Sequence, residues 1–261
     1  MPELPRRVLG NTGLEISVLG FGSLELRGMV AGVGRSIDEN RAEAILNQVL
    51  DSGINYIDTS VDYGGSEKRI GKFISARRSE FILATKCGCP PDISKFSPEE
   101  RTRYGVPLPS LHDYSRKNII DTLDQSLLRL NTDYIDVLQL HFSPSVELLK
   151  QESAIDTLAC LKQDGKIRFI GCSSILPNIM DHIKMGVFDV LQIPYSKLDP
   201  AHEHAIHLAS EAGIGTVIRG GVAKGLPDQQ HSSAAAWELW ELANLDAVSY
   251  THLTLPTNRE V

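Results

Sequence analysis

The sequence predicts an α/β protein in which helices cover a parallel β-sheet. Apolar, β-branched segments alternate with segments of helical periodicity, a pattern typical of successive β–α units. The expected strands span residues 16–21, 54–58, 80–86, 134–140, 167–172, 189–193 and 214–218. The expected helices span about 38–52, 66–76, 115–130, 147–163, 177–185 and 199–212. Four of these helices are followed by a glycine, which favours the left-handed backbone that ends a helix: Gly53, Gly165, Gly186 and Gly213.

Two architectures fit this alternation, a doubly wound sheet and a (β/α)8 barrel. A doubly wound dinucleotide-binding sheet needs G-x-G-x-x-G between a strand and a helix. The nearest segment, GVG at 32–34, has Ile37 in place of the third glycine and follows no clear strand. The barrel is therefore favoured. A turn at 11–13 (NTG), within 6–17, predicts a short β-hairpin before the barrel.

Composition excludes several classes of function. The formal net charge is −7, whereas a nucleic-acid surface needs clustered Lys and Arg. No apolar run approaches the roughly 18 residues of a membrane span, and the first ten residues, MPELPRRVLG, contain no apolar signal segment. We expect a cytoplasmic protein without a nucleic-acid or membrane partner, and the sequence does not indicate its oligomeric state.

Neither cysteines nor histidines show the spacing of a familiar metal motif. The 4 cysteines are too few for a disulfide framework in a chain of 261 residues. Cys87 and Cys89 form one close pair, but no second pair follows at zinc-finger spacing. The histidines of HEHAIH (202–207) miss the H-E-x-x-H register, because Ile206 stands at the required position. The sequence therefore predicts no metal site.

Polar side chains stand at the ends of three consecutive strands, where a barrel carries its chemistry. Asp58, Lys86 and His141 end the second, third and fourth strands, and Tyr63 lies in the loop after Asp58. A lysine cation lowers the pKa of a neighbouring tyrosine, and an aspartate holds that lysine in place. A histidine can orient a carbonyl group. Together they could protonate a carbonyl oxygen while a nicotinamide supplies the hydride. The long interval 88–114 should overhang this face.

These motifs resemble the aldo-keto reductase superfamily over roughly residues 6–225. The matching segments are LGNTGLEISVLGFGS (9–23), YIDTSVDYGGSEKRIG (56–71), ILATK (82–86), QSLLRLNTDYIDVLQLH (125–141), GKIRFIGCSS (165–174) and DVLQIPYS (189–196). The resemblance implies a catalytic tetrad of Asp58, Tyr63, Lys86 and His141, with Tyr63 as general acid/base. It also implies an extended nicotinamide cofactor, with NADP(H) favoured over NAD(H).

The resemblance also assigns cofactor contacts. Ser173 and Gln192 would bind the carboxamide, and Gly22 and Ser23 would lie near the ribose and nicotinamide. Ser174 stands where many members of the superfamily have asparagine, and it is included in the expected cofactor site.

Two features depart from the superfamily pattern. Arg219 stands where a tyrosine often stacks on the nicotinamide ring; the guanidinium could stack on the ring or point to the pyrophosphate. After a seventh helix at 237–247, the remaining residues do not resemble an eighth strand and phosphate-binding helix. We therefore expect one incomplete barrel domain over 1–247 that lacks the eighth strand and helix, and a non-native tail over 248–261.

The sequence supports three hypotheses about function. The first is an NAD(P)(H)-dependent oxidoreductase that reduces aldehydes and ketones or oxidises sugars and alcohols, with a small-molecule substrate. The second is a cofactor-binding regulatory or sensor subunit without catalysis. The third is an inactive, truncated fragment. The complete tetrad favours the first.

Overall fold

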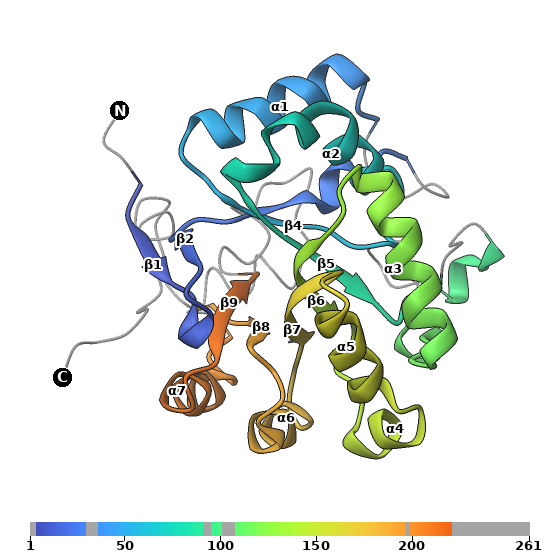
Figure 1. The fold of residues 1–261 in the computed structure, drawn as a ribbon, viewed down its shortest axis with the longest axis vertical. Coiled ribbons are helices and arrows are strands. Elements are labelled where there is room, and N and C mark those ends of the chain that lie inside the picture. The colour runs from blue at the N-terminus through green and yellow to red at the C-terminus, as the bar shows by residue number, and fades with distance from the viewer. Residues whose placement is uncertain (1–3, 30–35, 91–94, 101–107, 197–198, 221–261) are drawn as a thin grey trace.

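A curled, seven-stranded parallel sheet forms the centre of the protein (Figure 1). The structure is a computed structural model and describes residues 4–29, 36–90, 95–100, 108–196 and 199–220. The strands are hydrogen-bonded in chain order: β3 (Phe21–Gly22), β4 (Tyr56–Asp58), β5 (Ile82–Cys87), β6 (Ile135–Leu140), β7 (Ile167–Ser173), β8 (Val190–Pro194) and β9 (Gly215–Arg219). A doubly wound sheet would reverse the strand order partway across. The barrel-type sheet is confirmed across these strands.

Helices form an arc around the outer face of the sheet and follow it in chain order (Figure 1). They are α1 (Glu39–Asp51), α2 (Ser66–Ile74), α3 (Arg116–Leu130), α4 (Val146–Gln151), α5 (Ala154–Gln163), α6 (Ile179–Met185) and α7 (Glu203–Glu211). Short 3-10 helices include η1 (Gly10–Thr12) and η2 (Ser23–Arg27). Every helix among the described residues is too short or too polar to cross a lipid bilayer.

Two predicted elements are divided in the structure. The predicted strand 16–21 belongs to two sheets: β2 (Glu15–Ser17) pairs with β1 (Arg6–Val8) in the hairpin, and β3 joins the main sheet. The division follows Ser17, whose hydroxyl donates to the carbonyl of Leu19 at 2.7 Å. The predicted helix 147–163 is broken between α4 and α5, where Ser153 has a φ of 51°.

The N-terminal hairpin plugs the amino end of the sheet's interior. Its turn carries Leu9 and Leu14, which are 3% and 4% exposed. They pack with residues of the strands that face the interior: Tyr56, Ala84, Val137 and Val190, with Phe169 and Val217 beside them. The predicted hairpin is confirmed. Because these apolar side chains fill the amino end, polar groups of the interior are confined to the carboxyl end of the strands.

The segment that follows β4 is anchored by a buried carboxylate on α2. Glu67 is 1% exposed and accepts hydrogen bonds from Thr85 of β5 at 2.6 Å and from Nε of Arg129 at 2.8 Å. Gly71, one turn further along α2, lies directly against the end of α3. A Cβ at Gly71 would lie 2.1 Å from the carbonyl oxygen of Arg129. The close approach of the two helices therefore requires glycine.

Several sequence expectations lie outside the described residues. They are the GVG segment at 32–34, the helix at 237–247, the C-terminal limit of the domain at 247 and the proposed non-native tail at 248–261.

Replacing Gly71 tests the contact between α2 and α3. Alanine normally stabilises a helix interior relative to glycine, by about 1 kcal/mol. Here the clash with the Arg129 carbonyl should reverse that sign, and Gly71→Ala should lower the free energy of unfolding by about 1–3 kcal/mol. Urea denaturation measures the change. Lys68→Ala, at an exposed position of the same helix, is the control and should stay within about 0.5 kcal/mol. A stabilised Gly71→Ala protein would contradict the close contact.

Candidate functional site

The pairing register brings the predicted site residues onto the inner face of the sheet. Side chains two residues apart on a strand point to the same face. Tyr56, Ala84 and Val137 belong to the apolar cluster at the amino end of the interior. Two residues further along the same strands come Asp58, Lys86 and Gln139. By the same register, Gln192 and Arg219 follow the interior residues Val190 and Val217.

A buried ion pair forms the centre of the site. Lys86 is 1% exposed, and its Nζ donates to Oδ2 of Asp58 and to the carbonyl of Thr59, both at 2.7 Å. The amide of Gln139 donates to Oδ1 of Asp58 at 2.9 Å. Both carboxylate oxygens of Asp58 therefore have donors. Burial alone would lower the pKa of Lys86, but the Asp58 carboxylate and Tyr63 outweigh it and raise the pKa, so Lys86 is a cation at neutral pH.

Tyr63 lies beside this cation and keeps its proton at neutral pH. The ammonium of Lys86 is 4.7 Å from the centre of the Tyr63 ring. Desolvation raises the pKa of Tyr63 to about 12, and the charge of Lys86 only partly offsets it. The sequence-based expectation that Lys86 lowers the pKa of Tyr63 is correct for the effect of the lysine itself. It is wrong for the net shift, because desolvation raises this pKa by more than Lys86 lowers it. Neutral tyrosine is a proton donor, as protonation of a carbonyl oxygen requires.

His141 completes the group and is oriented by two further residues. Its ring centre is 6.2 Å from that of Tyr63, with an edge-on arrangement. Its Nδ1 lies 3.0 Å from Sγ of Cys89 and 3.4 Å from Oδ2 of Asp62. Burial lowers the pKa of His141, although the Asp62 carboxylate opposes the shift, so the ring is neutral at neutral pH. The structure thus gathers all four predicted tetrad residues at the carboxyl ends of β4, β5 and β6.

The end of the long interval 88–114 covers His141, as the sequence predicts. The hydroxyl of Tyr114 donates to the backbone carbonyl of His141. The ring centre of His112 lies 5.6 Å from that of His141. Residues from this loop therefore form one wall of the site.

Ser173 and Gln192 are placed where a ligand amide could reach them. They are adjacent in the register of β7 and β8, and each is 4% exposed. Their side chains have no hydrogen-bond partner among the described residues. Ser23 also has a buried hydroxyl without a described partner, and its carbonyl accepts from Ser66 at 2.6 Å. Gly22 is exposed and pairs with Asp58, so it borders the ion pair.

Ser174 and Arg219 differ from the other expected cofactor contacts. The hydroxyl of Ser174 lies 2.6 Å from Nδ1 of His182, whose Nε2 donates to the carbonyl of Pro144. Ser174 thus donates to His182 on α6, and its side chain faces away from Ser173. Arg219 is exposed at the carboxyl end of β9. Although the residue as a whole is exposed, desolvation of the guanidinium lowers the pKa of Arg219 against the opposing effects of Tyr63 and Asp58.

Sequence reasoning missed two residues that support the tetrad, Gln139 and Asp62. Gln139 spans the interior from β6 to reach Asp58. It fits because its neighbour is Gly171, where a Cβ would lie 2.9 Å from Cγ of Gln139. The alternation of inward residues along β6 could have identified Gln139 from Val137 and His141. Nothing in the sequence distinguishes Asp62 from an ordinary loop aspartate.

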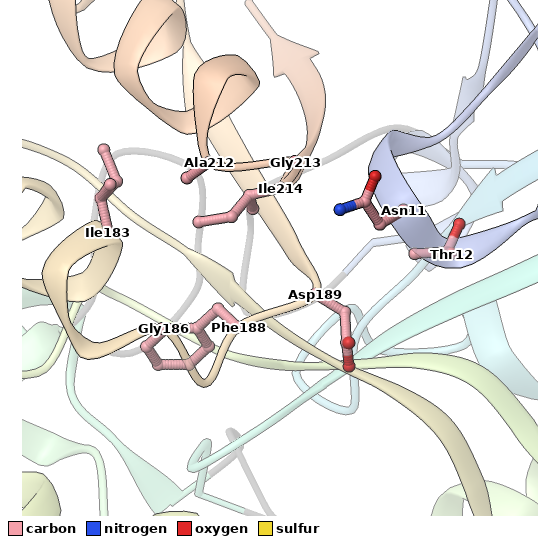
Figure 2. Close-up of a pocket in the computed structure, with 9 residues that line it drawn as sticks. All are labelled: Asn11, Thr12, Ile183, Gly186, Phe188, Asp189, Ala212, Gly213 and Ile214. Carbon is pink, nitrogen blue, oxygen red and sulfur yellow. The ribbon is translucent and has the colours of Figure 1, made fainter.

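A surface cavity occurs at the opposite end of the strands (Figure 2). Its lining includes Asn11 and Thr12 of η1, Asp189, Gly213 and Ile214. Asp189 and Ile214 immediately precede β8 and β9, so this cavity lies at the amino end of the sheet. The hairpin plug separates it from Asp58, Lys86 and His141.

Comparison with known proteins identifies a matching family. A family model described as aldo/keto reductase family matches residues 18–254. The chain is 34% identical over 224 residues to an uncharacterized oxidoreductase, YqkF, of Bacillus subtilis, covering 85% of this chain and 66% of the relative. It is 34% identical over 243 residues to L-galactose dehydrogenase of Arabidopsis thaliana, covering 88% and 69%. The chain thus spans about two thirds of the length of these relatives.

A solved structure supports the same family. The holo form of the aldo-keto reductase AKR11C1 from Bacillus halodurans superposes with a TM-score of 0.76 at 33% identity. The match covers 98% of this chain and 79% of that chain.

Asp58→Asn tests the central ion pair through stability alone. The substitution keeps the shape of the side chain but leaves the Lys86 ammonium buried without a carboxylate, and we expect the free energy of unfolding to fall by about 3 kcal/mol. Adding Lys86→Met removes that stranded charge, so the double variant should lose less than the sum of the single variants. Urea denaturation measures all three.

The control is Asp121→Asn, which breaks the exposed pair with Lys117 and should cost less than about 1 kcal/mol. Equal costs for Asp58→Asn and Asp121→Asn would show that the Lys86–Asp58 pair is not a stabilising buried pair.

Proposed function

The chain belongs to the aldo/keto reductase family of oxidoreductases, and from that premise we propose that it catalyses the NAD(P)(H)-dependent interconversion of carbonyl compounds and alcohols. The substrates are small aldehydes or ketones, or in the reverse direction sugars and alcohols, and the compartment is the cytoplasm. The observation that carries the proposal is the convergence of Asp58, Lys86, Tyr63 and His141 at one end of the sheet.

The residues around the tetrad fit a nicotinamide cofactor. Ser173 and Gln192 present a hydroxyl and an amide without described partners, which suit a carboxamide. Ser23 adds a buried hydroxyl that has no partner among the described residues. Gly22 has open space where a Cβ would stand. Ser174 is the weakest of the proposed contacts, because its hydroxyl is engaged by His182. When bound, a nicotinamide supplies or accepts the hydride.

Tyr63 acts as the general acid/base in this mechanism. It holds its proton at neutral pH and can donate it to the oxygen of a carbonyl as that oxygen gains negative charge. Lys86 stabilises the phenolate that remains, and Asp58 holds the lysine in position. His141, neutral and oriented through Nδ1, is placed to bind the same oxygen through Nε2. Tyr63, Lys86 and His141 would thus act at or beside one oxygen atom, where the negative charge develops, and Asp58 would support them through Lys86.

The cofactor and substrate preferences rest on likeness to relatives. We propose NADP(H) ahead of NAD(H), as the sequence resemblance implies, and fluorescence titration with NADPH and with NADH compares the two directly. The Arabidopsis relative is named L-galactose dehydrogenase, which supports including sugars among the first substrates assayed.

The alternative is a cofactor-binding regulatory subunit. Such a protein would bind a reduced nicotinamide cofactor yet fail to turn over any reactive carbonyl compound. The intact tetrad argues against it, because binding alone does not require a proton donor with a paired lysine. Turnover of a generic aldehyde in the presence of either reduced cofactor separates the two functions.

Tyr63→Phe tests the general-acid role. Removing the phenolic hydroxyl should lower kcat/KM for carbonyl reduction by about 10²–10⁴-fold, while cofactor affinity stays within a few-fold, because the aromatic ring is retained. Steady-state assays and fluorescence titration measure the two quantities. Tyr134→Phe, immediately before β6 and at the opposite end of that strand from the tetrad, is the matched control and should retain activity. Full activity in Tyr63→Phe would disprove the role.

Arg219→Met tests the position of the guanidinium. We propose that Arg219 lies beside the nicotinamide ring, because it follows the interior residue Val217 by two positions on β9 and the Asp58 carboxylate acts on it electrostatically. A cation there disfavours the positively charged oxidised ring. The substitution should therefore improve binding of the oxidised cofactor relative to the reduced one, by about five-fold for an interaction of about 1 kcal/mol. Equal weakening of both forms would instead place Arg219 at the pyrophosphate.

A further inference from the structure

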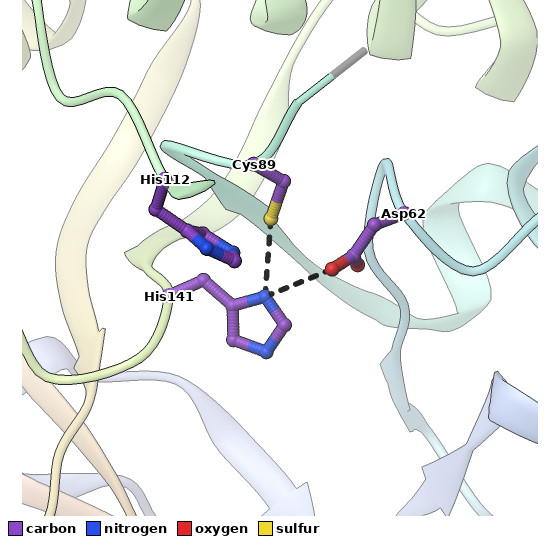
Figure 3. A group of neighbouring side chains, drawn as sticks. All are labelled: Asp62, Cys89, His112 and His141. Carbon is purple, nitrogen blue, oxygen red and sulfur yellow. Dashed lines mark hydrogen bonds and ion pairs between the residues drawn. The ribbon is translucent and has the colours of Figure 1, made fainter. Parts of the chain in front are cut away.

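Four side chains with metal-binding atoms gather around His141 of the tetrad (Figure 3): Asp62, Cys89, His112 and His141 itself. One ligand atom from each residue lies within 4.8 Å of those of all the others. The residues come from four separate segments: the loop after β4, the residues after β5, the loop before α3, and the end of β6. The expectation of no metal site considered only ligands at short sequence spacing, which cannot reveal a cluster of this kind.

Two buried atoms of the cluster make no hydrogen bond among the described residues, Oδ2 of Asp62 and Nε2 of His112. Oδ2 has only the 3.4 Å approach of Nδ1 of His141, itself a member of the cluster. Nδ1 of His112 lies 3.0 Å from the carbonyl of Leu108. A carbonyl can only accept, so Nδ1 carries the proton and Nε2 presents a lone pair. A carboxylate is also an acceptor. The cluster therefore contains two buried acceptors without a hydrogen-bond donor. A bound cation would supply the missing interaction for both of them.

The supporting contacts are those of metal ligands. A histidine that binds a metal typically donates its other ring N–H to a carbonyl, and ligating carboxylates are themselves hydrogen-bonded. His112 makes the first contact, to Leu108. Asp62 makes the second: the hydroxyl of Ser60 donates to its Oδ1 at 2.5 Å and leaves Oδ2 directed to the cluster.

Spacing and charge select the class of ion. Ligands of a tetrahedral zinc ion lie about 3.3–3.7 Å apart, from bond lengths of about 2.0–2.3 Å. Nδ1 of His141 is 3.4 Å from Oδ2 of Asp62, within this range. It is 3.0 Å from Sγ of Cys89, so these two atoms would have to separate by a few tenths of an ångström around an ion. A thiolate and a carboxylate would balance both charges of a divalent ion, so the buried site would be neutral. Thiolate and imidazole favour zinc over magnesium or calcium.

We propose that Oδ2 of Asp62, Sγ of Cys89, Nε2 of His112 and Nδ1 of His141 form a tetrahedral binding site for one zinc-class divalent ion. An ion at Nδ1 leaves the imidazole proton of His141 on Nε2, so the site holds this ring in one tautomer beside Tyr63. Binding at this site does not depend on the proposed oxidoreductase activity, and its test needs no turnover.

The test is a titration of the chelator-treated protein with Co²⁺. Tetrahedral cobalt–thiolate complexes absorb in the visible range and in the near ultraviolet. We expect one equivalent to bind with a thiolate-to-cobalt charge-transfer band, and Zn²⁺ to displace it. Cys89→Ser should abolish the band. His112→Gln should keep the band and weaken binding by at least the roughly 10–100-fold that accompanies loss of a supporting group.

Cys87→Ser and Cys160→Ser are the matched controls, because both thiols lie outside the cluster, one buried and one exposed. Both variants should bind Co²⁺ as the unaltered protein does. Two results would overturn the proposal. One is the absence of a charge-transfer band in the unaltered protein, which is the outcome expected if a water molecule, not a metal ion, occupies the cluster. The other is a band that persists in Cys89→Ser. The first result needs no variant, so it holds whether or not the substituted proteins fold.

Discussion

Lys86 is buried with its ammonium against Asp58, and the rest of the candidate site depends on that ion pair. A lone charge at this depth would lose its hydration without compensation. The carboxylate offsets that loss and keeps Lys86 charged, and Gln139 in turn satisfies the second carboxylate oxygen. The cation then acts on Tyr63 from 4.7 Å. These contacts form only if β4, β5 and β6 keep their pairing register. The same strand pairing therefore determines the sheet and the arrangement of the candidate site.

The environment of Tyr63 shows a balance between two opposing effects. Desolvation favours the neutral phenol, whereas Lys86 favours the phenolate, and in this structure desolvation is the larger. The same opposition acts on His141, where burial favours the neutral ring against the Asp62 carboxylate. Both groups are therefore neutral at neutral pH, and the fixed charges that surround them are the ones that can stabilise a new charge on a bound oxygen.

The sequence predicts the strands and helices that show clear periodicity, and the polar residues that stand where strands end. Asp58, Lys86 and His141 could be placed because each follows an apolar strand, and the hairpin because a turn separates Arg6–Val8 from Glu15–Ser17. The break at Ser153 could not be predicted, since helical periodicity continues across it. Asp62 and His112 were missed because their roles depend on partners from distant segments. The alternation along β6 turns Gln139 inward, but its contact with Asp58 depends on the packing of the interior. The net pKa shift of Tyr63 was missed because desolvation depends on packing.

The plug formed by Leu9 and Leu14 confines the apolar packing that seals the interior to the amino end of the sheet. Loops at the carboxyl end could therefore be changed without disturbing that packing. The apolar contacts that seal the interior lie at the amino end, whereas the long interval that covers His141 belongs to the carboxyl end. Loops from other proteins could therefore be grafted in place of residues 95–100, leaving His112 and its contact with His141 in place, without opening the sealed end. The protein is a scaffold in which substrate range could be selected from loop libraries while the framework is kept constant.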